Sequence, residues 1–117
     1  MSMTGADVEK VARDILHDEN STLYVWDGPA MVRALNAGVN QITRDRPDAL
    51  LSEAGALLTI TPLTVTTGTI SIADEFKDAL AQYAVHYLLM HHEGQKENRE
   101  RAVAHWGEYR IALGLVN

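Results

Sequence analysis

Several kinds of chemistry are missing from this chain of 117 residues. Cysteine does not occur, which excludes disulfide bonds and thiolate metal sites and fits a reducing compartment. The N-terminal stretch has no basic region followed by an apolar one. No apolar run approaches the roughly 20 residues that a membrane-spanning helix needs. We therefore expect a soluble protein that is not exported and has no membrane partner.

Concentrated positive charge is missing as well. The chain has 10 Lys and Arg against 16 Asp and Glu, a net charge of −6, and its basic residues are scattered among acids. Tight binding to a nucleic-acid backbone normally needs a concentrated basic surface, because affinity comes largely from neutralised phosphates. Direct binding of DNA or RNA is therefore disfavoured, and solubility explains the acidic balance.

Motifs of nucleotide binding and of nucleophilic catalysis are also lacking. The glycines are isolated along the chain, so no phosphate-binding loop is visible. No serine lies in a G-x-S-x-G context. The sequence thus predicts no catalytic residue and no cofactor, and the protein is not expected to be an enzyme.

Histidines are the strongest candidates for chemistry. Two ligands on one helix face prefer a spacing of three or four residues, whereas His91 and His92 diverge by about 100° and His86 precedes His91 by five. A simpler explanation of these histidines is that positive character is favourable at a helix C-terminus. No metal site is predicted, although a metal-dependent enzyme using His86, His91, His92 and His105 stays open as an alternative.

What the chain does contain is the composition of a globular protein. Apolar residues make up 46% and charged residues 22%, which is ordinary for a packed domain and unlike a disordered chain. The length suffices for one modest core. No internal repeat or low-complexity segment occurs, so we expect a single domain over residues 1–117.

The first two predicted helices have clear boundaries. The first follows a capping pair, Thr4 and Asp7, and ends near His17. The second follows an N-cap at Asp27 and ends before Pro47, which disfavours helix at the preceding residue. Their buried stripes are expected at Val8, Val11, Ala12, Ile15, Leu16, Met31, Leu35, Val39 and Ile42.

Two further helices are predicted in the C-terminal half. The third opens at residues 73–74 and fades at "HHEGQKE". The fourth runs from about 96 to 113, with Gly114 at the C′ position. A short turn around Gly94 joins them into an αα-hairpin.

Small and aromatic residues suggest how these helices pack. Ala34, Ala37 and Gly38 make one flank of the second helix small, which favours close helix packing over a ligand site. Aromatic residues and one cap are the candidate structural anchors: Trp26, Asp27, Phe76 and Trp106.

Between the second and third helices the period changes to two, which predicts a β-hairpin over residues 57–72. Pairing Val65 with Ile70 also pairs Leu63 with Ile72, so that four apolar side chains share one face around a loop at 66–69. Pro62 marks a bend or an edge ahead of this hairpin. The preceding "ALLSEAG" fits a short helical turn or an ordered loop. The fold class is therefore mainly α, a four-helix-bundle-like domain with an inserted hairpin.

The apolar face of such a hairpin must be covered, because an isolated two-stranded hairpin is barely stable. Its own helices or a neighbouring chain could cover it, and an exposed edge could pair with another subunit. We expect part of the cover to come from another chain. Candidate interface residues are Leu63, Val65, Ile70 and Ile72.

Four stretches, taken in order, resemble the head–tail connector, or adaptor, proteins of tailed bacteriophages. They are "MTGADVEKVARDILHDEN", "WDGPAMVRALNAGVNQITRDRPDA", "ISIADEFKDALAQYAVHYLL" and "NRERAVAHWGEYRIALG". The resemblance spans nearly the whole chain and is carried by the order and spacing of helix-packing patterns.

The resemblance implies a non-enzymatic structural protein of the virion, assembled from the host cytoplasm. Such proteins form a homo-oligomeric ring, often a dodecamer, that docks beneath the portal protein. The ring meets a downstream neck or tail protein, and DNA passes through its channel without sequence-specific binding. Extended segments and chain ends often reach neighbours, which points to 57–72 and to Leu115 and Val116 in the tail 114–117.

A small helical regulatory module, associated with nucleic acid or resembling an antitoxin, is the other alternative. It would bind DNA in a salt-dependent manner.

Overall fold

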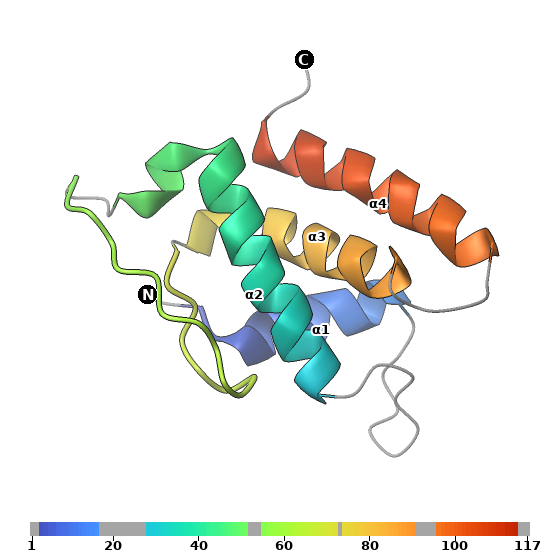
Figure 1. Cartoon of the computed structure of the whole chain (residues 1–117), viewed down its shortest axis with the longest axis horizontal. Helices are drawn as coiled ribbons and strands as arrows, with labels where there is room; N and C mark the ends of the chain where they lie inside the picture. Colours follow the sequence, from blue (N-terminus) through green and yellow to red (C-terminus); the bar gives the residue numbers. More distant parts are fainter. Residues whose placement is uncertain (1–2, 17–27, 52–54, 73, 91–95, 115–117) are drawn as a thin grey trace.

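The structure of the protein, a computed structural model, describes residues 3–16, 28–51, 55–72, 74–90 and 96–114. The chain in these ranges is mainly helical (Figure 1). Two short 3₁₀ helices flank the central connection, η1 at its start and η2 at its end. The elements in order are α1 (Gly5–Leu16), α2 (Gly28–Asp45), η1 (Pro47–Leu50), η2 (Asp74–Phe76), α3 (Lys77–Met90) and α4 (Lys96–Leu113).

Helix α1 begins with the predicted reciprocal cap. The Thr4 amide donates to Asp7 Oδ2 at 2.9 Å, and the Asp7 amide donates to Thr4 Oγ1 at 3.3 Å. These bonds satisfy amides that lack a partner within the first helical turn. The backbone hydrogen bond from Thr4 holds the pKa of the Asp7 carboxyl below its ordinary value. The helix then buries its apolar stripe against α3.

Helix α2 ends where the proline rule predicts, one residue before Arg46, and Pro47 opens η1. Its small flank serves close helix packing, as expected. A Cβ on Gly38 would lie 2.5 Å from Leu80 Cδ1 and 3.2 Å from Tyr83 Cδ1. The absence of that Cβ therefore lets α2 approach α3.

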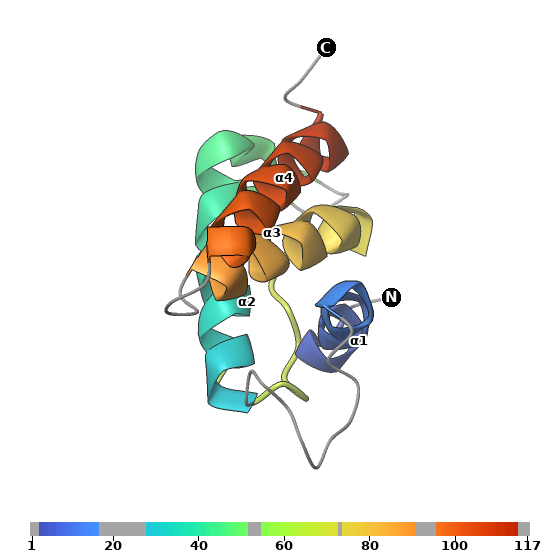
Figure 2. The same cartoon turned by 90° about the vertical axis from the view of Figure 1, so that its right-hand side faces the viewer.

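Helix α3 is the centre of the fold and packs against α1, α2 and α4. In Figure 2, α4, α3 and α1 form a row with α2 beside it. A helix covered on several sides is expected to be apolar nearly all round, which explains its composition. The buried residues of α3 are Ala79, Leu80, Ala81, Ala84, Val85, Leu88 and Leu89.

Helix α4 runs antiparallel to α3 (Figure 1) and has the bounds predicted from the sequence. It stops at Gly114, which takes a φ of +83°, and the Gly114 amide donates to Ile111 O at 3.0 Å. A left-handed residue is most easily supplied by glycine. The predicted turn around Gly94 lies outside the described residues, as do Trp26 and the predicted cap at Asp27.

The predicted β-hairpin at 57–72 is wrong. The described residues contain no strand, only isolated antiparallel bridges that join Thr4 to Thr69 and Leu51 to Leu57. The chain does reverse direction, in a turn closed by the Gly68 amide and Val65 O at 3.1 Å. The two arms nevertheless do not form a ladder.

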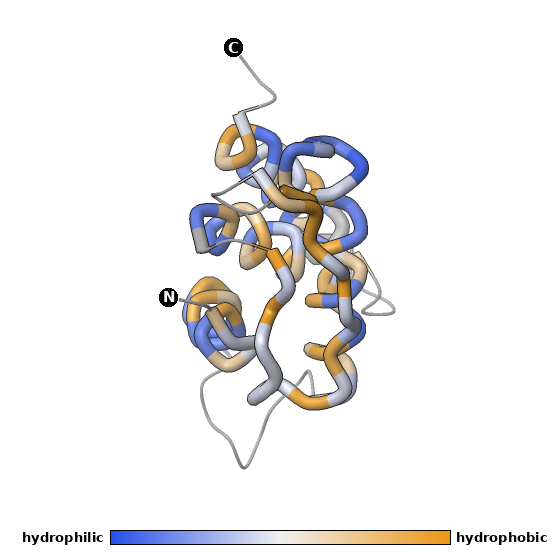
Figure 3. Tube along the Cα trace, turned by 90° about the vertical axis from the view of Figure 1, so that its left-hand side faces the viewer, coloured by the Kyte–Doolittle hydropathy of each residue, from blue (hydrophilic) through white to orange (hydrophobic). Residues whose placement is uncertain are grey.

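The physical reason is that other parts of the chain supply the hydrogen bonds and the cover. Side chains of α2 and of the segment itself bond the backbone of one arm, and the N-terminal residues bond the other. Residues 55–72, which we call the extended segment, run between α1 and α2 (Figures 2 and 3). Leu63, Ile70 and Ile72 of this segment therefore reach the core of their own chain.

Candidate interaction surface

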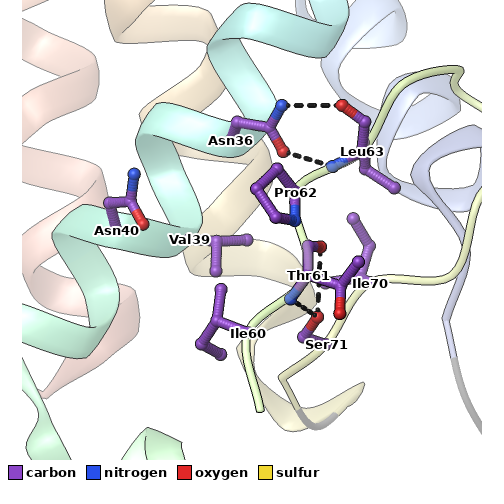
Figure 4. Close-up of a pocket in the computed structure, with 9 residues that line it drawn as sticks. All are labelled: Asn36, Val39, Asn40, Ile60, Thr61, Pro62, Leu63, Ile70 and Ser71. Carbon is purple, nitrogen blue, oxygen red and sulfur yellow. Dashed lines mark hydrogen bonds between the residues drawn. The ribbon is translucent and has the colours of Figure 1, made fainter.

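The extended segment is held to α2 by one asparagine. Asn36 Nδ2 donates to Leu63 O at 3.0 Å, and the Leu63 amide donates to Asn36 Oδ1 at 2.8 Å (Figure 4). A primary amide can donate and accept side by side, so one side chain replaces both bonds that a partner strand would have made. Sequence reasoning missed Asn36, because a single polar residue on a helix resembles any solvated position.

Three further hydrogen bonds hold the returning arm of the segment. Ser71 Oγ accepts from the Thr61 amide at 2.9 Å and joins the two arms (Figure 4). The Ile70 amide donates to Met3 O at 2.9 Å, and the Gly5 amide donates to Gly68 O at the same distance. The returning arm thus pairs briefly with residues 3–5, where α1 begins.

Three of the four predicted interface residues on this segment are covered by their own chain. Leu63, Ile70 and Ile72 are buried in the core, whereas Val65 is 56% exposed. The candidate interface within the segment therefore reduces to Val65. The tail residues Leu115 and Val116 lie outside the described residues.

A second exposed residue on the segment was not predicted. Leu57 is 76% exposed, the largest value among the exposed large apolar residues in the described chain. It lies before Pro62, outside the residues that the predicted hairpin pairs. Residues 54–73 contain no charged side chain, and the exposed residues of the segment include Leu57, Pro62, Val65 and several threonines.

A small pocket lies where the segment meets α2 (Figure 4). Its volume is about 50 Å³, far below the roughly 300 to 1,000 Å³ of a typical ligand site. It could hold the tip of one aliphatic side chain, but no substrate of ordinary size. The lining residues are Asn36, Val39, Asn40, Ile60, Thr61, Pro62, Leu63, Ile70 and Ser71.

The other notable surface belongs to α4. The inward face packs Tyr109, which is fully buried, and Trp106, which is half-buried against Tyr83 and His86. The outward face also carries apolar residues: Val103 is 66% exposed and Ile111 59% exposed. Apolar residues on both faces are unusual for a helix at the surface of a single chain.

The buried end of α4 is fixed by polar contacts with the end of α2. Tyr109 Oη donates to Asp45 Oδ2 at 2.6 Å, and Gln41 Nε2 donates to the same oxygen at 3.0 Å. Burial, followed by the hydrogen bond to Asp45, raises the pKa of Tyr109 well above its ordinary value. The phenol is therefore neutral in the folded protein and acts as a donor.

Arg46 connects the two helix ends directly. Its Nη1 donates to Leu113 O at 2.9 Å, its Nε and Nη2 donate to the Asp48 carboxylate, and its guanidinium lies 5.7 Å from the Phe76 ring centre. The hydrogen bonds from Arg46 hold the pKa of Asp48 below its ordinary value. Phe76, an expected core anchor, is buried.

The histidines that the structure describes are bound to neighbouring groups. His86 Nδ1 lies 2.7 Å from Ala102 O, and His105 Nδ1 lies 2.7 Å from Gln82 Oε1. Burial, and then the charge of Arg101, lowers the pKa of His105. Within the described ranges no three His, Asp or Glu side chains gather as metal ligands, while His91 and His92 fall outside these ranges.

No helix in the part of the chain that the structure describes has the length and apolar character needed to cross a membrane. Compared with protein-family models, with curated proteins and with solved structures, the chain gives no match in any of the three comparisons.

Proposed function

We propose that this protein is a head–tail connector of a tailed bacteriophage, a non-catalytic subunit of a ring beneath the portal. The sequence resemblance supplies the family, and the distribution of apolar surface supports the assembly role. The ring would extend the DNA channel and meet a neck or tail protein on its other side. Its location would be the head–tail interface of the virion, reached from the host cytoplasm during assembly.

The observation that supports this proposal best is the presence of two apolar surfaces on opposite sides of one subunit. One is the outer side of the extended segment, with Leu57 and Val65, and the other is the outer face of α4, with Val103 and Ile111. Figure 1 places the segment and α4 on opposite sides of α3. A ring requires such an arrangement, because head-to-tail contacts join two different surfaces of each subunit.

The shape of the subunit and the character of its sites are compatible with the same role. The molecule is flat, with extents of 44 × 34 × 18 Å, so opposite edges are well separated. The pocket described is too small for an ordinary substrate, and the described histidines bond to neighbouring helices. These features support scaffolding rather than catalysis.

Charge supports passage of DNA rather than its capture. With a net charge of −6, the chain would repel a duplex at most orientations, so DNA could slide through a channel built from it. We infer that any contact with DNA is weak and independent of sequence.

The gene neighbourhood provides the first test, since the proposal expects a portal gene and tail genes on either side. The second test is mass photometry of the full chain at high concentration, with and without the portal protein encoded beside it. Assembly into a ring, alone or on the portal, is expected. A chain that stays monomeric in both conditions would overturn the proposal.

Each of the two alternatives has a test of its own. Binding to DNA that weakens steeply with salt would favour the regulatory module. A stoichiometric metal ion in protein purified without a histidine tag would favour the enzyme that uses His86, His91, His92 and His105.

A further inference from the structure

Helices α2 and α4 are joined at one corner of the fold (Figure 1). Both helices pack against α3 and have little direct contact with each other. In the described residues, two hydrogen bonds link the end of α2 to α4. Tyr109 Oη donates to Asp45 Oδ2 at 2.6 Å, and Arg46 Nη1 donates to Leu113 O at 2.9 Å. Helix packing specifies a crossing angle only to about 15 to 20°, so direct bonds between α2 and α4 narrow the direction of α4.

Arg46 uses three nitrogens and one face of its guanidinium at this corner. Its Nε and Nη2 donate to the two oxygens of Asp48, at 3.0 and 2.6 Å, while Nη1 reaches Leu113 O. The group also lies 5.7 Å from the ring centre of Phe76. A guanidinium is planar and rigid, so the paired bonds to Asp48 also set the direction of Nη1. One side chain thus contacts η1, η2 and α4 together.

The sequence builds this arrangement from three consecutive residues, Arg46, Pro47 and Asp48. Pro47 opens η1 with a restricted φ, and the two charged residues that flank it bond to each other. The acceptor, Leu113 O, is one of the last four carbonyls of α4, which have no partner within a helix. A cation is also favourable at a helix C-terminus. Arg46 therefore caps α4 from 67 residues away in the sequence.

Stability alone does not explain the pair of charged residues. The side chains of Arg46 and Asp48 are 39% and 54% exposed, and exposed ion pairs contribute little to the stability of a fold. The buried neighbours Phe76 and Leu113 supply the apolar contact at this corner. What the exposed pair adds is direction, because it ties the end of α4 to both ends of the central connection, η1 and η2.

We propose that Arg46, oriented by Asp48, is a positioning residue that fixes the direction of α4 relative to the extended segment. The segment follows η1 and precedes η2 in the chain, so one side chain holds α4 to both of its ends. The inference rests on the proposed ring and deepens it. Head-to-tail contacts close a ring only if the two joining surfaces of each subunit keep the right angle, and otherwise they give open chains.

A distance measurement within one subunit tests the positioning. The chain contains no cysteine, so Leu57→Cys and Ile111→Cys, both at exposed positions, can carry spin labels on the segment and on α4. Pulsed electron paramagnetic resonance of the labelled full chain, diluted with unlabelled wild type, should give one narrow distance distribution. Arg46→Ala should broaden or shift this distribution while circular dichroism shows unchanged helix content. An unchanged distribution would overturn the proposal.

Three more variants separate the fork from its charge. Arg44→Ala is the matched control, since it removes the same charge from an exposed position two residues earlier, and it should leave the distribution narrow. Asp48→Asn should broaden the distribution, and should add nothing to Arg46→Ala, because Asp48 acts through Arg46. Arg46→Lys keeps the charge without the planar fork and should not restore the narrow distribution. Restoration by lysine, or equal broadening by Arg44→Ala, would overturn the role of the fork.

Mass photometry of the full chain, with and without the portal, tests the connection to ring closure. The wild type should give one discrete ring mass. Arg46→Ala should still associate but give a spread of masses, with a several-fold smaller fraction in the ring. A variant that broadens the distance distribution yet closes rings as well as the wild type would overturn the connection to closure. If the wild type forms no ring, the proposed function fails, whereas the distance measurements still decide the role of Arg46.

Discussion

Replacing Asn36 by alanine tests whether a side chain holds the extended segment in place of a strand partner. The substitution removes two hydrogen bonds to Leu63, of 3.0 and 2.8 Å. Each is worth about 0.5 to 1.5 kcal/mol, and a buried backbone group left without a partner costs about 1 to 3 kcal/mol. Because Leu63 is buried, we expect the free energy of unfolding to fall by about 2 to 4 kcal/mol, a large part of the total for a domain of this size.

Asn40→Ala is the matched control for this experiment. Asn40 lies one turn later on α2, lines the same pocket and is exposed. Both substitutions gain the same helix propensity, roughly half a kcal/mol, so their difference isolates the two bonds. Urea denaturation followed by circular dichroism measures the stabilities, and hydrogen exchange of the Leu63 amide localises the loss. If Asn36→Ala is within about 0.5 kcal/mol of Asn40→Ala, the segment is not held in this way.

Three further substitutions test the core and the first helix. Tyr109→Phe should lower the free energy of unfolding by about 1 to 3 kcal/mol, because it removes the hydrogen bond to Asp45. Because folding raises the pKa of the buried phenol, the stability of the wild type should fall above pH 10. The variant has no phenol to ionise at this position, so its alkaline denaturation curve should show a smaller fall. Gly38→Ala should cost about 1 to 3 kcal/mol in urea denaturation through its clash with α3, while Gly107→Ala should gain stability, and equal effects would contradict the close packing. Thr4→Ala should cost about 1 kcal/mol in thermal unfolding, because it removes the bond from the Asp7 amide to Thr4 Oγ1; an unchanged unfolding temperature would argue against the cap.

The helices could be predicted because their signals are local. The Thr4 cap, the proline after α2 and the glycine after α4 act within one turn of chain, so each boundary follows from a few neighbouring residues. The close approach at Gly38 was also foreseeable, since a run of small residues on one helix flank has few other uses.

Whether residues 57–72 form a β-hairpin could not be predicted from neighbouring residues alone. Alternating apolar residues predict which side chains are covered, and Leu63, Ile70 and Ile72 are indeed buried. They do not predict what provides the hydrogen bonds. Here Asn36, 27 residues away from Leu63, satisfies the backbone of one arm, and the residues before α1 satisfy the other. Period-two patterning therefore identified burial correctly for three of the four residues, with Val65 exposed, and β pairing incorrectly.

The exposed apolar residues differ from most of the predicted interface residues, because the chain covers its own hairpin-like segment. Once the chain covers three of its own apolar residues, the exposed apolar surface that is left must lie elsewhere. Apart from Leu51 and Met90, the exposed large apolar residues of the described chain are Leu57 and Val65 at one side and Val103 and Ile111 on α4 at the other. The sequence already showed apolar residues at Val103 and Ile111 of α4. They lie away from the helix face that buries Tyr109, and apolar residues are not typical of a solvated face.

The size of these surfaces indicates when a ring should form. Full burial of a Val, Leu or Ile side chain is worth about 1.5 to 3 kcal/mol, and the four residues concerned are a little more than half to three-quarters exposed. One contact between two copies would then gain about 4 to 8 kcal/mol, against an association cost of about 4 to 15 kcal/mol. A single contact is therefore marginal, and an isolated dimer should be scarce. Closure of a ring adds one contact without adding a subunit, and a portal template lowers the cost of bringing copies together. The subunit is thus expected to be monomeric when dilute and to assemble cooperatively at high concentration or on the portal, without populated intermediates of two or three copies.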